Sequence, residues 1–398
     1  MAGLDQTPAG LRTQIGIFGK TNSGKSSVLN MITGSDTAIV SPLAGTTTDP
    51  VKKSMELGAL GPCLFIDTPG TFDPSDLSEK RQERMQSVMK ACDIGLIVVK
   101  DASDVADEKE RYEWLRAHNV RVLFVLNKSD DKEVEKETEK ALGDMAGTGF
   151  VTVDARSGIG RDDLIEAIIK CGEGGRKDSL LKDCVSAGDC ILLVMPQDKL
   201  APKGRLILPQ VMTIRELLDR DAVTIGITPE KMDEALAMLK APPKLIITDS
   251  QVFPKVYEKK PPESLITSFS ILMAGLKGDL KVYAEGAAAI DRLHDGSRVL
   301  IAESCTHAPA DEDIGRVKIP ALIRKRRGGD IEFDICAGDA FQKDLSDYDL
   351  IIQCGGCMAG RRLIMSRIEE AKEAGVSITN YGLAIAYLSG IFDKIYIP

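Results

Sequence analysis

The 398-residue chain lacks several features that would place it in a specialised class of protein. No stretch approaches the ~20 consecutive apolar residues that a transmembrane helix needs, which argues against a membrane span or membrane partner. Residues 1–13 lack the apolar core of a secretory leader, so we expect a cytoplasmic protein. Basic residues are in the minority, with 51 Lys and Arg against 60 Asp and Glu and a net charge of -9. That balance is poorly suited to gripping phosphate backbones, so we expect no nucleic-acid partner.

The composition is that of a globular protein, with 43% hydrophobic and 28% charged residues. At roughly 150 residues per domain, the length predicts two or three domains. The nine cysteines are an odd number in a chain without an export signal. In a reducing compartment, cysteines are expected to be buried apolar residues or metal ligands rather than disulfides.

Short apolar runs alternate with amphipathic stretches, a pattern typical of parallel strands joined by crossover helices. The pattern predicts an α/β protein with three units: a first domain over 10–172, a small α/β domain over 178–276 and a third α/β domain over 277–398. In the first domain the expected strands are Gln14–Phe18, Cys63–Ile66, Ile94–Val99, Val122–Leu126 and Phe150–Val153. The middle unit contains no phosphate loop, which favours a structural or association role.

Gly19 to Ser26 form a complete GxxxxGK[ST] phosphate loop between an expected strand and an expected helix. In such a loop the backbone N–H groups cradle the phosphates of a nucleotide. Lys25 is expected to reach the β- and γ-phosphates, and Ser26 is expected to ligate Mg²⁺. The loop residues predicted to contact the nucleotide are Gly19, Asn22, Ser23, Gly24, Lys25, Ser26 and Ser27.

Three further segments complete a guanine-nucleotide site. Asp67-Thr68-Pro69-Gly70 follows an expected strand, so that Asp67 can hold the Mg²⁺ shell and the Gly70 N–H can approach the γ-phosphate. Asn127-Lys128-Ser129-Asp130 ends another strand, and the Asp130 carboxylate can accept from N1–H and the 2-amino group of guanine, which selects GTP over ATP. Ala155, preceded by Asp154 where Ser is usual, is placed to offer its backbone N–H to the guanine O6.

A threonine between the phosphate loop and Asp67 is expected to be a further Mg²⁺ ligand; we favour Thr47, with Thr46 as the alternative. The predicted catalytic groups are therefore Lys25, Thr47, Asp67 and Gly70. Thr71 stands where Ras-like enzymes have a water-orienting Gln, and no obvious arginine finger is present in the chain. Asn22 resembles the loop asparagine of the TrmE–Era–EngA group, which implies a slow GTPase that K⁺ stimulates, with Asn22 as the K⁺ ligand.

The cysteines divide into two groups. Cys63, Cys92 and Cys190 lie in or beside apolar segments and are expected to be buried; Cys336 is favoured as a core residue, and Cys171 and Cys184 have no partner at a metal-site spacing. Cys354-Gly-Gly-Cys357 instead follows an apolar strand, as does Cys305-Thr-His307. Three thiolates with one further ligand suit an iron–sulfur cluster or a Cys₃His zinc site, and a CxxC pair alone could be redox-active.

The phosphate loop followed by CxH and CxxC resembles the HydF family of FeFe-hydrogenase maturation GTPases, over essentially the whole chain. The resemblance implies a 4Fe-4S cluster on Cys305, Cys354 and Cys357 with an exchangeable fourth position, for which His307 is the candidate. Gln353 replaces the second histidine of the family pattern. It further implies a homodimer formed through the middle domain, a two-iron subcluster precursor as cargo, and radical-SAM maturases and apo FeFe-hydrogenase as partners.

Two other functions remain open from the sequence. One is a TrmE- or Era-like GTPase in tRNA modification or ribosome assembly, and the other is a GTP-regulated zinc or redox protein. The basic run Arg324 to Arg327 is interpreted either as a solvated helix end or as a docking site for an acidic partner or anionic cargo.

Overall fold

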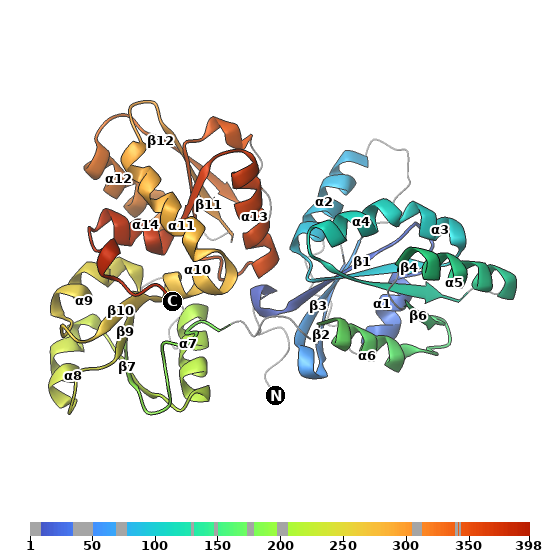
Figure 1. Ribbon diagram of the computed structural model, residues 1–398, viewed down its shortest axis with the longest axis horizontal. Coiled ribbons are helices and arrows are strands. Elements are labelled where there is room, and N and C mark those ends of the chain that lie inside the picture. The colour runs from blue at the N-terminus through green and yellow to red at the C-terminus, as the bar shows by residue number, and fades with distance from the viewer. Residues whose placement is uncertain are drawn as a thin grey trace. The chain divides into compact units, whose positions relative to one another are not determined.

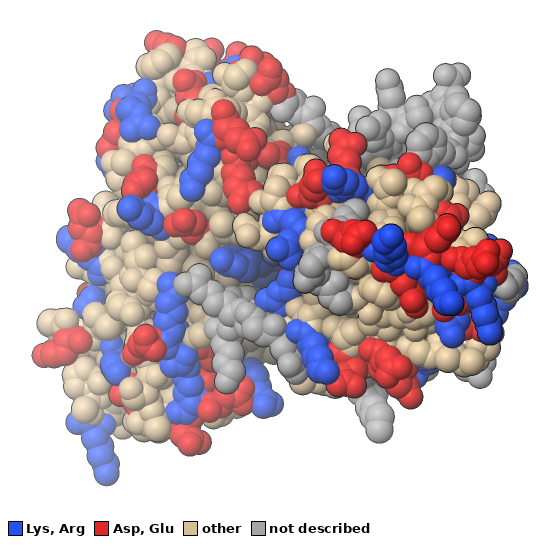
Figure 2. Space-filling view, turned by 45° about the vertical axis from the view of Figure 1, so that its right-hand side comes forward, with Lys and Arg blue, Asp and Glu red and all other residues tan. Residues whose placement is uncertain are grey.

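A computed structural model describes residues 9–34, 51–68, 78–128, 131–146, 150–172, 179–196, 206–304, 313–338, 341 and 344–398 (Figure 1). The chain divides into two compact units, residues 1–176 and 177–398. Within the described ranges, no helix has the length and apolar character that crossing a bilayer requires. On the face drawn in Figure 2, acidic and basic side chains are interspersed.

The first unit contains a six-stranded sheet in the order β2-β3-β1-β4-β5-β6. All neighbours are parallel except β2, which is antiparallel to β3. The strands are β1 (Thr13–Phe18), β2 (Val51–Leu57), β3 (Gly61–Asp67), β4 (Ile94–Val99), β5 (Arg121–Asn127) and β6 (Phe150–Val153). The five predicted strands are confirmed, and β2 is an addition.

Helices cover both faces of this sheet because its central strands are apolar on both sides. On one face Ile15, Leu96 and Val125 share a core with α1 and α6; on the other Ile97 and Phe124 pack with the remaining helices. The helices are α1 (Lys25–Thr33), α2 (Ser78–Ala91), α3 (Ala102–Asp107), α4 (Lys109–Ala117), α5 (Lys132–Ala146) and α6 (Arg161–Gly172). This arrangement is the doubly wound fold expected of a phosphate-loop protein.

The second unit contains two four-stranded parallel sheets. The first has the order β10-β9-β7-β8, with β7 (Cys190–Val194), β8 (Val223–Ile227), β9 (Leu245–Thr248) and β10 (Leu265–Ser268). Its helices are α7 (Leu208–Asp219), α8 (Met232–Met238), α9 (Phe253–Lys259) and α10 (Phe269–Lys277). The apolar pattern of the sequence predicts a helix near Ser264–Leu276, but residues 265–268 form β10 and the helix begins only at Phe269.

The second sheet has the order β12-β11-β13-β14, with β11 (Arg298–Glu303), β12 (Glu332–Ala337), β13 (Leu350–Gln353) and β14 (Ser377–Asn380). Its helices are α11 (Leu280–Ala287), α12 (Ile319–Arg327), α13 (Arg361–Glu373) and α14 (Tyr381–Leu388), with a π-helical turn over Ile314–Lys318. Apolar runs at Arg298–Ala302, Ile331–Ile335 and Leu350–Ile352 predict β11, β12 and β13, whereas β14 was not predicted.

One apolar cluster joins the two sheets of the second unit. It contains Leu192 and Ile246 of the first sheet together with Leu300 and Ile351 of the second. The carboxyl-terminal segment adds a backbone link, since Tyr396 N donates to Ile266 O of β10 at 2.7 Å. The two sheets therefore share a core, although the sequence pattern predicts two domains in this region.

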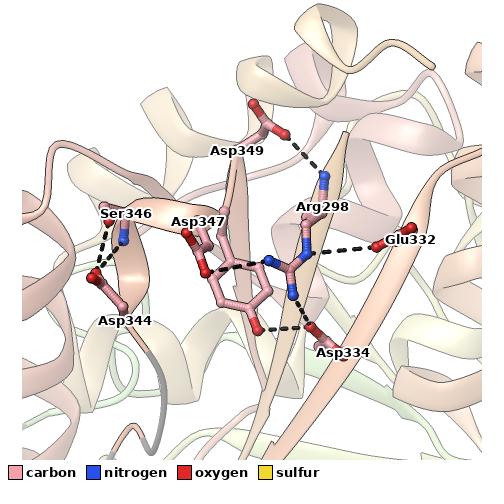
Figure 3. Close-up of polar contacts among 8 residues, drawn as sticks. Arg298, Glu332, Asp334, Asp344, Ser346, Asp347 and Asp349 are labelled. Carbon is pink, nitrogen blue, oxygen red and sulfur yellow. Dashed lines mark hydrogen bonds and ion pairs between the residues drawn. The ribbon is translucent and has the colours of Figure 1, made fainter. Parts of the chain in front are cut away.

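Arg298 ties the amino ends of three strands together (Figure 3). Its guanidinium contacts Asp334 of β12 at 2.8 Å and Asp347, just before β13, at 3.4 Å, while its backbone N–H donates to Asp349 at 2.9 Å. The guanidinium also lies 4.9 Å from the centre of the Tyr348 ring. These contacts hold β11, β12 and β13 together at their amino ends. The segment Cys354–Cys357, called the cysteine loop below, follows the opposite end of β13.

We predict that Gly286→Ala in α11 destabilises the second unit. An added Cβ would lie 1.9 Å from the carbonyl oxygen of Ile378 in β14, so the helix would have to move away from the sheet. Overpacking of this kind costs about 1–3 kcal/mol, which urea denaturation measures.

Gly143→Ala in α5 is the matched control because it makes the same change at an exposed helical position with open space around it. There the substitution should stabilise the first unit by about 0.5–1 kcal/mol. Stabilisation by Gly286→Ala as well would contradict the close approach of α11 to β14.

Candidate functional site

The phosphate loop joins β1 to α1 through backbone conformations that favour glycine. Gly19 and Gly24 have φ values of 141° and 97°, and Asn22 has a φ of 67°. An added Cβ at Gly24 would lie 2.2 Å from the Asn127 side chain, and one at Gly19 would lie 2.4 Å from the Val98 carbonyl oxygen. Both glycines are thus required by strain and by close approach.

Lys25 begins α1 and is 7% exposed. Its Nζ donates to the carbonyl oxygens of Gly19 at 2.9 Å and Lys20 at 2.8 Å, so the ammonium lies within the curl of the loop. Burial lowers the pKa of Lys25, while the nearby Asp67 carboxylate acts in the opposite direction. Ser23 is buried, and Ser26 and Ser27 are exposed in the first turn of the helix.

Asp67 ends β3 beside the same turn of helix. Ser26 Oγ donates to Asp67 Oδ2 at 2.7 Å, and the buried Oδ1 atom has no partner among the described residues. Burial raises the pKa of Asp67, while Ser26 and Lys25 lower it. A hydroxyl and a carboxylate with a spare oxygen form a donor set that suits Mg²⁺.

Asn127 connects two segments of the predicted nucleotide site. Its Nδ2 donates to Ser23 O at 3.1 Å, and its Oδ1 accepts from the Ala155 N–H at 3.2 Å. Lys128 is exposed, and its N–H donates to Val153 O at 2.7 Å. The structure therefore brings Asn127, Ala155 and the phosphate loop together.

Asp154, which stands where serine is usual in the predicted guanine-binding loop around Ala155, has a structural role in that loop. Its carboxylate accepts from Ser157 Oγ at 2.6 Å and from the N–H groups of Arg156 and Ser157 at 3.0 and 3.2 Å. These hydrogen bonds lower the pKa of Asp154, and the bond from Ser157 Oγ has the largest effect. The side chain thus organises the turn that presents Ala155.

Several predicted site residues lie outside the described residues. In the nucleotide site these are Thr46, Thr47, Gly70 and Asp130, and in the cysteine site they are Cys305 and His307. Their roles stay predictions.

The Cys354–Cys357 loop follows the carboxyl end of β13. Cys354 N donates to Ala302 O of β11 at 2.9 Å, and the Ser304 N–H lies 3.2 Å from Cys354 Sγ. Gly356 has a φ of 60°, and an added Cβ there would lie 2.7 Å from Ile364. Both thiols are half-buried, so the loop holds two potential ligands beside the residue that precedes Cys305.

Lys277, which no sequence pattern predicted as a site residue, lies beneath this loop. It is 3% exposed, and its Nζ donates to the carbonyl oxygens of Gly356, Cys357 and Ala359 at 2.8, 3.1 and 2.7 Å. Burial lowers the pKa of Lys277 to about 8, against the opposing effect of Cys357 and Cys354. No sequence motif links a lysine to a loop 79 residues further along the chain.

Arg367 and Gln353 are also buried at this edge of the sheet. Arg367, 1% exposed, donates to Ser304 Oγ at 3.3 Å and Glu303 O at 3.4 Å, and also to Gly338 O. Gln353, also 1% exposed, has a buried Oε1 without a partner in the part of the chain that is described. Among the described residues, no group of three metal-ligating side chains is found. Cys305, the predicted third cysteine ligand, lies outside the described residues.

The other cysteines belong largely to the core. Cys63 and Cys92 are fully buried and Cys336 is 6% exposed, as predicted. Burial raises the pKa of Cys63 to about 12, which keeps that thiol protonated. Cys171 and Cys184 are half-buried. The prediction that Cys190 is buried is wrong, because this residue is the first of β7 and is also only half-buried.

The basic run Arg324 to Arg327 makes internal contacts at the end of α12. Arg326 pairs with Asp291 at 2.8 Å, Arg327 donates to Leu293 O at 3.0 Å, and Arg324 lies 4.8 Å from the Phe333 ring centre. These contacts favour the helix-end interpretation over a docking site.

The fold, the phosphate loop and the Asn127 bridge define a P-loop protein of the GTPase class. Residues 14–128 match the model of the 50S ribosome-binding GTPase family. GTPase Der of Wolinella succinogenes is 37% identical over 43% of this chain and 37% of its own length. MnmE, the tRNA modification GTPase of Brachyspira hyodysenteriae, is 33% identical over 39% of this chain and 33% of its own length. The chain thus spans about a third of the curated relatives it matches.

Among solved structures, Era of Aquifex aeolicus bound to GDP·AlF₄⁻ covers 57% of this chain and 98% of its own, with 19% identity and a TM-score of 0.34. The rest of the chain is more distinctive. Residues 180–278 match the hydrogen maturase F dimerization domain, and residues 281–398 match the hydrogen maturase F tetramerization domain. The chain belongs to the HydF family of hydrogenase maturation GTPases.

We predict that Asp67→Asn raises the melting temperature of the nucleotide-free protein at neutral pH. The folded state raises the pKa of Asp67 through burial, so ionisation of this carboxylate costs stability. Its favourable contribution is complete below the unfolded pKa of about 3.9 and is lost as the pH rises through the folded value. The advantage of the variant should therefore shrink on acidification, as calorimetry between about pH 4 and 7 measures.

With Mg²⁺ and GDP present, the order should reverse, because the wild-type carboxylate gains a cation. Ser26→Ala is the control, because it keeps the Asp67 carboxylate. Its melting temperature at pH 7 should not exceed that of wild type. Equal melting temperatures for Asp67→Asn and wild type at every pH would contradict the buried-carboxylate account.

Proposed function

We propose that this protein hydrolyses GTP and carries a 4Fe-4S cluster, and that it acts as a scaffold delivering a two-iron subcluster precursor to apo FeFe-hydrogenase. The observation that carries the proposal is the Cys354–Cys357 loop at the carboxyl end of β13, beside Ser304, in a chain that also has a phosphate loop. The proposed units are the GTPase domain over 10–172, a dimerisation domain over 178–276 and a cluster domain over 277–398.

The nucleotide half of the proposal is supported by the described positions of Lys25, Ser26 and Asp67. Lys25 would meet the β- and γ-phosphates after leaving the Gly19 and Lys20 carbonyls. Ser26 and Asp67, whose Oγ and Oδ2 atoms lie 2.7 Å apart, would hold Mg²⁺ together with Thr47. A bound Mg²⁺ ion neutralises the charge that develops on the phosphates. Lys128 and Asp130 would bind the guanine base. The proposed catalytic set is Lys25, Thr47, Asp67 and Gly70.

The cluster half is supported by the chemistry of the loop. Two half-buried thiols separated by two glycines suit convergence on one inorganic centre, and Cys305 directly follows Ser304, whose N–H contacts Cys354 Sγ. Hydrogen bonds from backbone N–H groups to cluster sulfurs are a common feature of such sites. Cys305, Cys354 and Cys357 are the proposed ligands, and His307 is the proposed fourth. A bound cluster supplies an iron with an exchangeable position.

Oligomerisation follows from the two family models, which are named for dimerization and tetramerization. The proposed partners beyond the homo-oligomer are radical-SAM maturases and the apo-hydrogenase. The similarity to Der and MnmE lies within the GTPase domain, so it does not favour a role in tRNA modification.

Anaerobic reconstitution tests the cluster directly. Wild type should bind about four iron and four sulfide per chain and give a cluster EPR signal after reduction, whereas Cys354→Ala should lose most of both. Cys63→Ala is the matched control, because that thiol lies in the GTPase core. Bound zinc without sulfide would support the alternative of a zinc protein. An unchanged EPR signal in Cys354→Ala would rule out Cys305, Cys354 and Cys357 as the ligand set.

GTP hydrolysis should be slow in NaCl and several-fold faster in KCl. Asn22, exposed in the phosphate loop, is the proposed K⁺ ligand, and a cation there would take the role of an arginine finger. Asn22→Ala should remove the K⁺ response, while Asn30→Ala, on the exposed side of α1, should keep it. Equal rates in the two salts for wild type would dismiss the K⁺ site.

A further inference from the structure

The buried ammonium of Lys277 is bound entirely by one loop. Its three hydrogen bonds go to the carbonyl oxygens of Gly356, Cys357 and Ala359, at 2.7 to 3.1 Å. Three acceptors require three N–H donors, which only the protonated amine has. The side chain therefore carries a positive charge in a place where it is 3% exposed.

This charge has no carboxylate partner among the described residues. Glu303, a buried acid at the carboxyl end of β11, is already paired with Arg316 at 2.7 Å. Arg367 repeats the pattern, because its described acceptors are two carbonyl oxygens and the Ser304 hydroxyl, and its Nε has no described partner. Two buried cations with neutral partners thus lie at the carboxyl end of β11 and β13.

Burying an unpaired cation is costly unless an anion is nearby. Lys277 is the last residue of α10, so the negative end of the helix dipole offers some compensation, but this effect is smaller than the cost of removing an ammonium from water. Lys277 donates to the carbonyl oxygen of Cys357 itself at 3.1 Å, so the ammonium lies beside the loop that carries the Cys354 and Cys357 thiols. The arrangement is balanced when these thiols are thiolates that hold an anionic centre.

We propose that Lys277 is the counter-ion and positioning residue of the cysteine loop: it fixes the loop through three carbonyl groups and compensates the negative charge of the thiolate-bound centre. This inference rests on the cluster assigned above. A positive charge close to a cluster favours its reduced state, and hydrogen-bonded loop carbonyls keep Cys354 and Cys357 at a fixed spacing.

Lys277→Met tests the proposal because it keeps the length of the side chain and removes the charge and the three donors. In the reconstituted full-length protein, its cluster should have a more negative midpoint potential in an EPR-monitored redox titration. An iron chelator should extract its iron roughly tenfold faster. Lys277→Arg, which keeps a cation, should recover most of the potential.

Lys281→Met is the control for a change of net charge, since it removes an exposed lysine in the first turn of α11. It should match wild type in potential and in iron release. If circular dichroism shows that Lys277→Met does not fold, Lys277→Gln takes its place, because the amide retains donors without a charge.

The outcomes separate the two proposals. A wild-type protein that takes up no cluster defeats the proposed function, and the role of Lys277 with it. A wild-type cluster whose potential and iron release are the same in every folded neutral Lys277 variant overturns the counter-ion role and leaves the cluster assignment standing.

Discussion

Parallel pairing of buried strands is the constraint on which both candidate sites depend. Strands covered by helices on both faces expose little besides their ends, so polar and reactive groups collect in the loops that follow them. The phosphate loop follows β1, Asp67 ends β3, and the Cys354–Cys357 loop follows β13. At the opposite edge of the last sheet, Arg298 and its carboxylate partners hold the strands in register.

The two loops are held in different ways. The phosphate loop is shaped mainly by its own backbone, with three residues at positive φ and a close fit of Gly24 against Asn127. The cysteine loop has a single glycine at positive φ, and a side chain from a distant helix reaches into it to occupy its carbonyl oxygens. A loop of the first kind is recognisable from its own residues, whereas the second kind needs the fold to bring Lys277 to it.

That difference explains how far the sequence could be interpreted. Motifs with fixed spacing predicted the phosphate loop, the Asp67 and Asn127 segments and the apolar strands around them. β2 was missed because it is a largely polar, half-exposed edge strand paired antiparallel in a hairpin with β3. β10 was hidden because it passes directly into α10, so strand and helix form one apolar stretch. Lys277 was missed because its partners are backbone carbonyls, which leave no trace in the sequence.

The shared core of the second unit bears on how such a chain could be assembled from parts. Leu192 and Ile246 pack in the same cluster as Leu300 and Ile351, so removing either sheet would expose the apolar face of the other. We therefore expect the two sheets to fold as one unit. The GTPase unit has apolar cores of its own. The parts of Der and MnmE that are similar to this chain make up only about a third of those proteins. The boundary near residue 176 is therefore where recombination would leave both products foldable.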